Sequence, residues 1–260
     1  MATPPALRSL EYWAYQYKRT WRGSLVSSFG SPVLFLAAMG VGLGSLVDKG
    51  GHSATRLGGV SYLVFLAPGL LAAAAMQTAA IESTYPVLGA IKWIRTYYGM
   101  LATPLRVVDV LAGHLLWIAF RILSTSVIFL AVMAAFGATA SWGALWVIPA
   151  GFLTGMAFAG PIAAFSATQE DDQTLPSLFR FMIIPMFLFS GTFFPITQLP
   201  IGLRPVAYIT PLWHGVDLCR TLALGRASIG MSIVHFTYLA AWAVAGAALA
   251  NVTFRRRLVT

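Results

Sequence analysis

The chain alternates between long apolar stretches and shorter polar segments. Six of the apolar stretches have about the length of a membrane-spanning helix, which needs about 20 apolar residues to cross about 30 Å of hydrocarbon. They cover residues 26–47, 60–81, 108–135, 143–167, 178–195 and 232–254. The fifth stretch is the shortest and contains Pro185. This pattern predicts an all-α polytopic membrane protein with six transmembrane helices in a single domain, residues 1–260.

The segment before the first stretch, residues 1–25, is too polar to cross a membrane. It alternates aromatic residues with basic ones, as in Trp13, Tyr17, Lys18 and Arg19. Such a segment is typical of an amphipathic helix at the membrane surface, where aromatic rings are buried and basic groups face anionic headgroups. We therefore expect an interfacial helix here. A disordered tail is the alternative.

Two further polar or interrupted segments look specialised. Residues 83–106 mix aromatic and basic side chains and end at a proline step, Thr103-Pro104, so we expect a short amphipathic helix that suits docking to a soluble partner. Residues 196–230 are apolar but contain Pro200 and Pro211, which prevent one continuous helix. Two short helices dipping partway into the outer leaflet would satisfy this backbone, so we predict a re-entrant hairpin between spans five and six.

The composition supports a lipid environment. Hydrophobic residues make up 58% of the chain and charged residues only 10%, with a net charge of +9 and a mean hydropathy of +0.77. A soluble domain carries about 25% charged residues. The positive charge could indicate nucleic acid, but the bases lie between apolar runs, as in cytoplasmic loops of membrane proteins. We therefore expect membrane lipid, and no nucleic acid, as a partner.

The distribution of basic residues predicts the orientation, because Lys and Arg are retained in cytoplasmic loops. With the N-terminus inside, eleven bases are cytoplasmic: Arg8, Lys18, Arg19, Arg22, Lys92, Arg95, Arg106, Arg180, Arg255, Arg256 and Arg257. Five lie outside: Lys49, Arg56, Arg204, Arg220 and Arg226. Both termini are therefore expected in the cytoplasm.

Catalytic and cofactor motifs are missing from the sequence. It contains no GxxxxGK[ST] phosphate-binding loop and no HExxH metal motif, and Cys219 is its single cysteine. We therefore expect no catalytic residue, cofactor or metal on this chain. Ser190 with a histidine such as His235 is a weak candidate for an intramembrane serine enzyme. An ion-coupled carrier usually needs midplane carboxylates, and none is obvious, so a transporter of this kind would draw its energy from a partner.

Arg121 is the exception to the apolar rule, because it lies near the middle of the third span. An unpaired arginine there costs about 2.5–3.5 kcal/mol on insertion scales. Either Arg121 lines a translocation path and meets a polar or anionic substrate, or it makes a structural bond to Glu82, Asp109 or helix carbonyls. The sequence leaves both open. The pairs Gly40–Gly44 and Gly151–Gly155 predict close helix packing, within the bundle rather than between subunits.

Several runs resemble the ABC-2 type permease family. Residues 189–225 read FSGTFFPITQLPIGLRPVAYITPLWHGVDLCRTLALG and resemble the C-terminal signature of this family. Residues 101–117, LATPLRVVDVLAGHLLW, resemble the segment that enters its third span. Within the family, the chain resembles the nodulation protein J group and, more distantly, daunorubicin-resistance permeases and capsule exporters. The resemblance covers nearly the whole chain in order.

The resemblance implies a permease subunit of an ATP-binding-cassette exporter in the bacterial inner membrane. ATP and Mg²⁺ would bind a separate ATPase, and a homodimer of permeases would assemble with two ATPases. The cargo would be amphipathic: a lipo-oligosaccharide, lipid or drug. An ion-coupled secondary carrier, an intramembrane enzyme and an assembly subunit are the rival classes.

The resemblance also assigns candidate site residues to three groups. The ATPase-coupling group is Trp93, Ile94, Tyr97, Tyr98, Met100 and Leu101. The substrate-path group is Arg121 and Glu82. The outer exit group, on the re-entrant segment, is Pro200, Arg204, Pro211, His214, Asp217 and Arg220.

Overall fold

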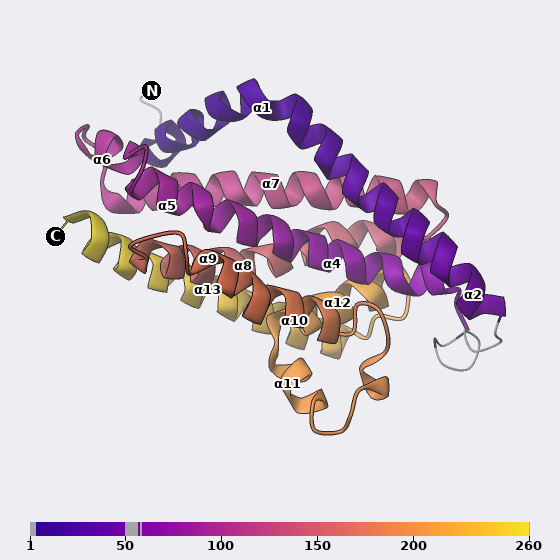
Figure 1. The fold of residues 1–260 in the computed structure, drawn as a ribbon. Coiled ribbons are helices and arrows are strands. Elements are labelled where there is room, and N and C mark those ends of the chain that lie inside the picture. Colours follow the sequence, from indigo (N-terminus) through magenta and orange to yellow (C-terminus); the bar gives the residue numbers. More distant parts are fainter. Residues whose placement is uncertain (1–3, 50–56, 58, 260) are drawn as a thin grey trace.

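The computed structural model describes residues 4–49, 57 and 59–259, and every regular element in them is a helix. Figure 1 shows an elongated bundle with both chain termini and the short helix α6 (Thr96–Leu101) at the same end. Arg56, which we assigned to the outer side, lies outside the described residues. The all-α class predicted from the apolar pattern is confirmed.

The N-terminal segment and the first span form one helical run without an intervening loop. Helix α1 covers Pro5–Phe35 and continues through the π-helix η1 (Leu36–Leu43) into α2 (Gly44–Lys49). Figure 1 shows α1 changing direction along its length. The alternative of a disordered tail is wrong from Pro5 onward. The early turns of α1 also pack on the bundle, because the Trp13 and His114 rings lie 4.4 Å apart.

Four apolar helical stretches are long enough to cross a membrane, judged by length and composition over the described residues. They are Tyr62–Ile91, Val107–Ala135, Trp142–Thr168 and Ile229–Val259. They comprise α4 (Tyr62–Ser83) with α5 (Tyr85–Ile91), α7 (Val107–Ala135), η2 (Trp142–Trp146) with α8 (Val147–Thr168), and α13 (Ile229–Val259). Two shorter apolar stretches, Pro32–Val47 and Leu175–Phe189, correspond to the first and fifth predicted spans. The number six stays a prediction.

The predicted limits of the fifth span are wrong. The helical run starts earlier, as α9 (Leu175–Leu178), η3 (Phe179–Ile183) and α10 (Ile184–Phe189), and it ends at Phe189 instead of residue 195. The chain turns at Gly191, whose φ of +83° favours glycine. An apolar sequence therefore continues for several residues after the helix has stopped.

The prolines of residues 196–230 divide this segment as predicted. After η4 (Ile196–Gln198), two short helices follow, α11 (Arg204–Ile209) and α12 (Pro211–Ala223). Figure 1 shows α11 projecting from the bundle, whereas α12 lies against it. The dipping of this pair into a leaflet stays a prediction.

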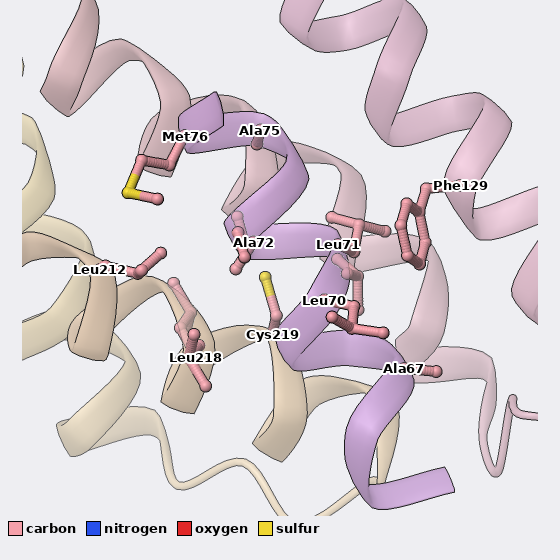
Figure 2. Packing of buried hydrophobic residues seen from close by; sticks show 14 of the residues in the cluster. Ala67, Leu70, Leu71, Ala72, Ala75, Met76, Phe129, Leu212, Leu218 and Cys219 are labelled. Atoms are coloured by element: carbon pink, nitrogen blue, oxygen red, sulfur yellow. The ribbon is translucent and has the colours of Figure 1, made fainter. Parts of the chain in front are cut away.

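The core surrounds α4. Figure 2 shows its buried side chains between Cys219 and Leu218 of α12 on one side and Phe129 of α7 on the other. Small residues let the backbones approach here. A Cβ atom at Gly151 would lie 2.6 Å from Leu71 Cδ2, and one at Gly155 would lie 2.7 Å from Ile122 Cδ1. This glycine pair therefore packs within the bundle, as expected.

Helices α8 and α13 cross closely at Gly246, and this crossing predicts a stability effect. A Cβ atom at Gly246 would lie 2.1 Å from Pro161 Cδ, so Gly246→Leu must push the two helices apart. We expect overpacking to cost about 1–3 kcal/mol and to lower the apparent melting temperature in detergent. Gly230→Leu on the same helix is the matched control, because nothing lies within 4 Å of a Cβ there. Equal melting temperatures for the two variants would contradict the observed crossing.

Candidate functional site

Arg121 pairs with Glu82 inside the bundle. Arg121 Nε lies 2.9 Å from Glu82 Oε1, and the Trp117 indole N–H donates to Glu82 Oε2 at 3.2 Å. Residues 117 and 121 are one turn apart on α7, so both donors face the end of α4. The side chains of Arg121 and Glu82 are only 13% and 17% exposed. Of the bonds considered for Arg121, the structure selects the one to Glu82.

The Tyr17 ring of α1 packs against the Arg121 guanidinium of this ion pair. The Arg121 guanidinium carbon lies 5.0 Å from the centroid of the Tyr17 ring, which is within cation–π range. The same ring lies 5.3 Å from the Trp117 ring. Sequence reasoning found the aromatic character of this segment but not the contact, because nothing in the local pattern pairs Tyr17 with a residue on α7.

A cavity of about 220 Å³ adjoins the ion pair between α1, α4, α7 and α10. Its lining is formed by Pro32, Phe35, Leu70, Ala74, Gln77, Thr78, Ile81, Glu82, Arg121, Thr125, Phe129 and Phe187. The Thr78 and Thr125 hydroxyls in this lining share a hydrogen bond at 3.3 Å. The lining therefore combines apolar side chains with two hydroxyls, an amide and the Glu82–Arg121 pair, as an amphipathic ligand requires.

A second cavity, of about 360 Å³, also has Glu82 in its lining. Aromatic residues dominate this lining, which includes Tyr12, Tyr17, Trp93 and Trp117. Glu82 therefore borders both cavities, whereas Arg121 borders only the first.

The coupling segment predicted at 83–106 contains α5, a tight turn and α6. The turn exposes Trp93 (58%) and Ile94 (66%), and Tyr98 on α6 is also exposed. Met100 and Leu101 are half-buried. These five side chains give the end of the bundle an apolar, partly aromatic surface.

Tyr97 differs from its neighbours, contrary to its place in the predicted docking group. Its side chain is fully buried, and its hydroxyl lies 2.7 Å from His114 Nδ1. Burial raises the pKa of Tyr97 well above its usual value. Tyr97 therefore anchors α6 to α7 and cannot contact a partner at the surface.

Glu170 connects this segment to the C-terminal helix. Its carboxylate accepts hydrogen bonds from Arg257 on α13 and from Lys92 at the end of α5. These two bonds lower the pKa of Glu170 to about 2, and the bond from Arg257 has the larger effect. The cluster joins three segments that are distant in the sequence, and no local motif predicts it.

Arg220, which was assigned to the predicted exit group, donates hydrogen bonds to backbone carbonyls of two other segments. Its Nε donates to the carbonyl of Phe65 at 3.0 Å, and its Nη2 donates to the carbonyl of Gly191 at 2.8 Å. The Phe65 ring lies 3.8 Å from its guanidinium carbon. Arg204 makes a similar local bond to the carbonyl of Leu199. Pro211 opens α12, whereas Pro200 lies exposed before α11.

His214 and Asp217 meet in a network that includes a residue of α13. His214 Nδ1 lies 2.8 Å from His235 Nδ1, and His235 Nε2 lies 3.1 Å from Asp217 Oδ2. Ser190 instead shares a hydrogen bond with the Thr192 hydroxyl at 3.0 Å. Within the described residues, the serine and His235 therefore have separate partners, which does not support a serine–histidine catalytic pair.

Every regular element that the structure describes is a helix, and four helical stretches are long and apolar enough to cross a membrane, which is the architecture of a multi-pass membrane protein. A profile of the ABC-2 type transporter family matches residues 10–224, and the chain therefore belongs to this family. It is a permease subunit of a membrane ABC exporter, a transport subunit rather than an enzyme, and its family implies an ABC ATPase partner.

Curated relatives agree over the full length. Nodulation protein J of Rhizobium leguminosarum bv. trifolii is 32% identical over 257 residues, which cover 98% of this chain and 95% of that protein. The protein of the same name from R. leguminosarum bv. viciae is 31% identical over 264 residues, covering 100% and 99%. That of Rhizobium meliloti (strain 1021) is 30% identical over 94% of this chain and 90% of its own length.

The buried ion pair predicts an asymmetric mutational response. Arg121→Ala leaves Glu82 without its cationic partner, so we expect the free energy of unfolding to fall by about 3 kcal/mol. This value is at the lower end for a buried pair, because both side chains keep some exposure. The double variant Glu82→Gln/Arg121→Gln removes both charges and should recover most of this loss. Apparent melting temperatures in detergent measure both effects. A double variant less stable than Arg121→Ala would contradict the pairing.

Proposed function

We propose that the chain forms the translocation path of an inner-membrane exporter for an amphipathic substrate, such as a lipo-oligosaccharide, lipid or drug. The observation that carries this proposal is the largely apolar cavity with the Glu82–Arg121 pair at its boundary. The apolar lining suits a hydrocarbon portion of the substrate, and the ion pair suits a polar or anionic headgroup. The names of the relatives do not specify a substrate, so the proposal of an amphipathic substrate rests on the cavity.

The size of the cavity bears on the mechanism. Sites for drug-sized ligands measure about 300–1,000 Å³, whereas this cavity measures about 220 Å³. An amphipathic molecule of that size fits only after helices move apart. We infer alternating access, in which two permease chains, most simply two copies of this one, open and close the path while two ATPases bind and hydrolyse ATP.

The route by which the partner acts is proposed from the helix connections. Trp93 and Ile94 present an apolar surface at the bundle end that also holds both termini, which we place in the cytoplasm. Helix α5 follows α4 directly after Thr84, and Glu82 is in the last turn of α4. If the ATPase displaces α6, α5 would therefore move with it and shift the Glu82 carboxylate at the end of α4.

Filling the cavity should stop transport without unfolding the protein. Ala74→Trp adds a large ring to the cavity wall, so we expect ATP-dependent export from proteoliposomes that also contain the ATPase to fall at least about tenfold. Ala248→Trp is the control, because Ala248 is exposed on α13. Export unchanged in Ala74→Trp would remove the cavity from the path. Export that persists without the ATPase, driven by an ion gradient, would establish the secondary-carrier alternative.

Truncating the exposed turn should uncouple the partner. The double variant Trp93→Ala/Ile94→Ala removes most of the apolar docking surface, and we expect ATPase stimulation by the permease to fall at least about tenfold, the range of interface hot spots. Trp142→Ala is the matched control, because Trp142 is 90% exposed and follows the opposite end of α7. Full stimulation in the double variant would assign the coupling surface elsewhere.

A further inference from the structure

A groove runs between the start of α7 and the end of α13, at the end of the bundle that holds both termini. It encloses about 820 Å³ and is lined by Leu101, Leu105, Arg106, Val107, Val108, Arg255, Arg256, Leu258 and Val259. Three arginines thus share a groove with six apolar side chains. The cavity beside the Glu82–Arg121 pair shares no lining residue with this groove, and of the coupling surface only Leu101 borders it.

The groove is strongly cationic. The Arg106 side chain is 83% exposed, and its ion pair with Asp109 involves Nε alone, at 3.4 Å. The Asp109 carboxylate also accepts the Arg106 backbone N–H at 2.9 Å, so it caps α7 and is not part of the groove lining. Arg255 is exposed and has no hydrogen bond or ion pair with any residue that the structure describes. Arg106 and Arg255 therefore present positive charge at the surface of the groove with little compensation.

The apolar part of the groove includes exposed helix surface. Val108 on the first turn of α7 is 40% exposed, and Val259 at the end of α13 is 73% exposed. Both helices are long and apolar enough to span a membrane, and each has more residues than the hydrocarbon requires, so we expect their ends in the headgroup region. Guanidinium groups beside exposed apolar side chains match a molecule that has an anionic head and a hydrocarbon tail.

We propose that this groove is a binding site for an anionic phospholipid. The headgroup phosphate lies between the guanidinium groups of Arg106 and Arg255, which offer paired N–H donors to phosphate oxygens. An acyl chain follows Val108 and the neighbouring apolar residues toward the hydrocarbon. The bound lipid bridges the start of α7, which carries Arg121, and the C-terminal helix. A soluble anion would leave the apolar half of the groove uncovered.

Lipid retention by the full chain tests this site. Purified protein in detergent is titrated with dioleoylphosphatidylglycerol or with dioleoylphosphatidylcholine, and bound lipid is counted by native mass spectrometry. We expect preferential retention of phosphatidylglycerol. In Arg106→Gln/Arg255→Gln its affinity should fall about thirtyfold, about fivefold for each arginine near a headgroup. Arg106→Lys/Arg255→Lys keeps the charge and should retain most of the binding, which shows that the site still folds.

The matched control is Arg95→Gln/Arg180→Gln, which removes two exposed arginines outside the groove. We expect its affinity for phosphatidylglycerol to stay within twofold of the wild-type value. Equal losses in the two Gln double variants would assign the binding to overall charge and overturn the site. Equal retention of phosphatidylcholine, or displacement of the lipid by an equal concentration of glycerol 1-phosphate, would also overturn the proposal of a phospholipid site.

Discussion

Every backbone carbonyl inside a bilayer needs a hydrogen-bond donor, because hydrocarbon offers none. Helices meet this need internally, so carbonyls beyond the end of a helix need donors from other parts of the protein. After α10 ends at Phe189, side chains from other elements supply the donors: Arg220 reaches the carbonyl of Gly191 at 2.8 Å, and the Tyr62 hydroxyl reaches that of Phe193 at 3.1 Å. Because Arg220 also binds the carbonyl of Phe65 on α4, satisfying this irregular stretch fixes α12 against the core.

The same requirement governs the charged groups of the bundle. Arg121 would be costly in an apolar span on its own, and Glu82 would be costly at the end of α4, but each removes the cost of the other. The break between α4 and α5 lies directly after Glu82, where the Thr84 hydroxyl donates to the carbonyl of Ala80 at 2.9 Å and closes the last turn. The ion pair therefore lies at the break between α4 and α5, next to the coupling segment.

Hydropathy and spacing were sufficient for the helices but not for the contacts. Residues 108–135 were predicted within one residue of α7, because a long apolar run leaves little choice of structure in a membrane. The fifth span was misplaced because Phe193, Phe194 and Pro195 continue the apolar run after the helix has ended. Phe193 and Phe194 are half-buried against protein, which hydropathy does not distinguish from burial in lipid. Arg121 was identified as unusual, yet three partners were possible. Pairs such as Glu170 with Lys92 depend on tertiary packing, so no local spacing reveals them.

The two interpretations of Arg121, structural and functional, are compatible on energetic grounds. A buried ion pair contributes little net stability, because the desolvation of both charges offsets most of their attraction. Such a pair can be exchanged at low cost for contacts with a ligand that supplies an equivalent anion to Arg121. Since Glu82 borders both cavities, a movement of α4 and α5 that separated the carboxylate from Arg121 would change both cavities and expose the cation at the same time. Under the proposed function, the contact that holds α4 to α7 would then also take part in recognising the substrate.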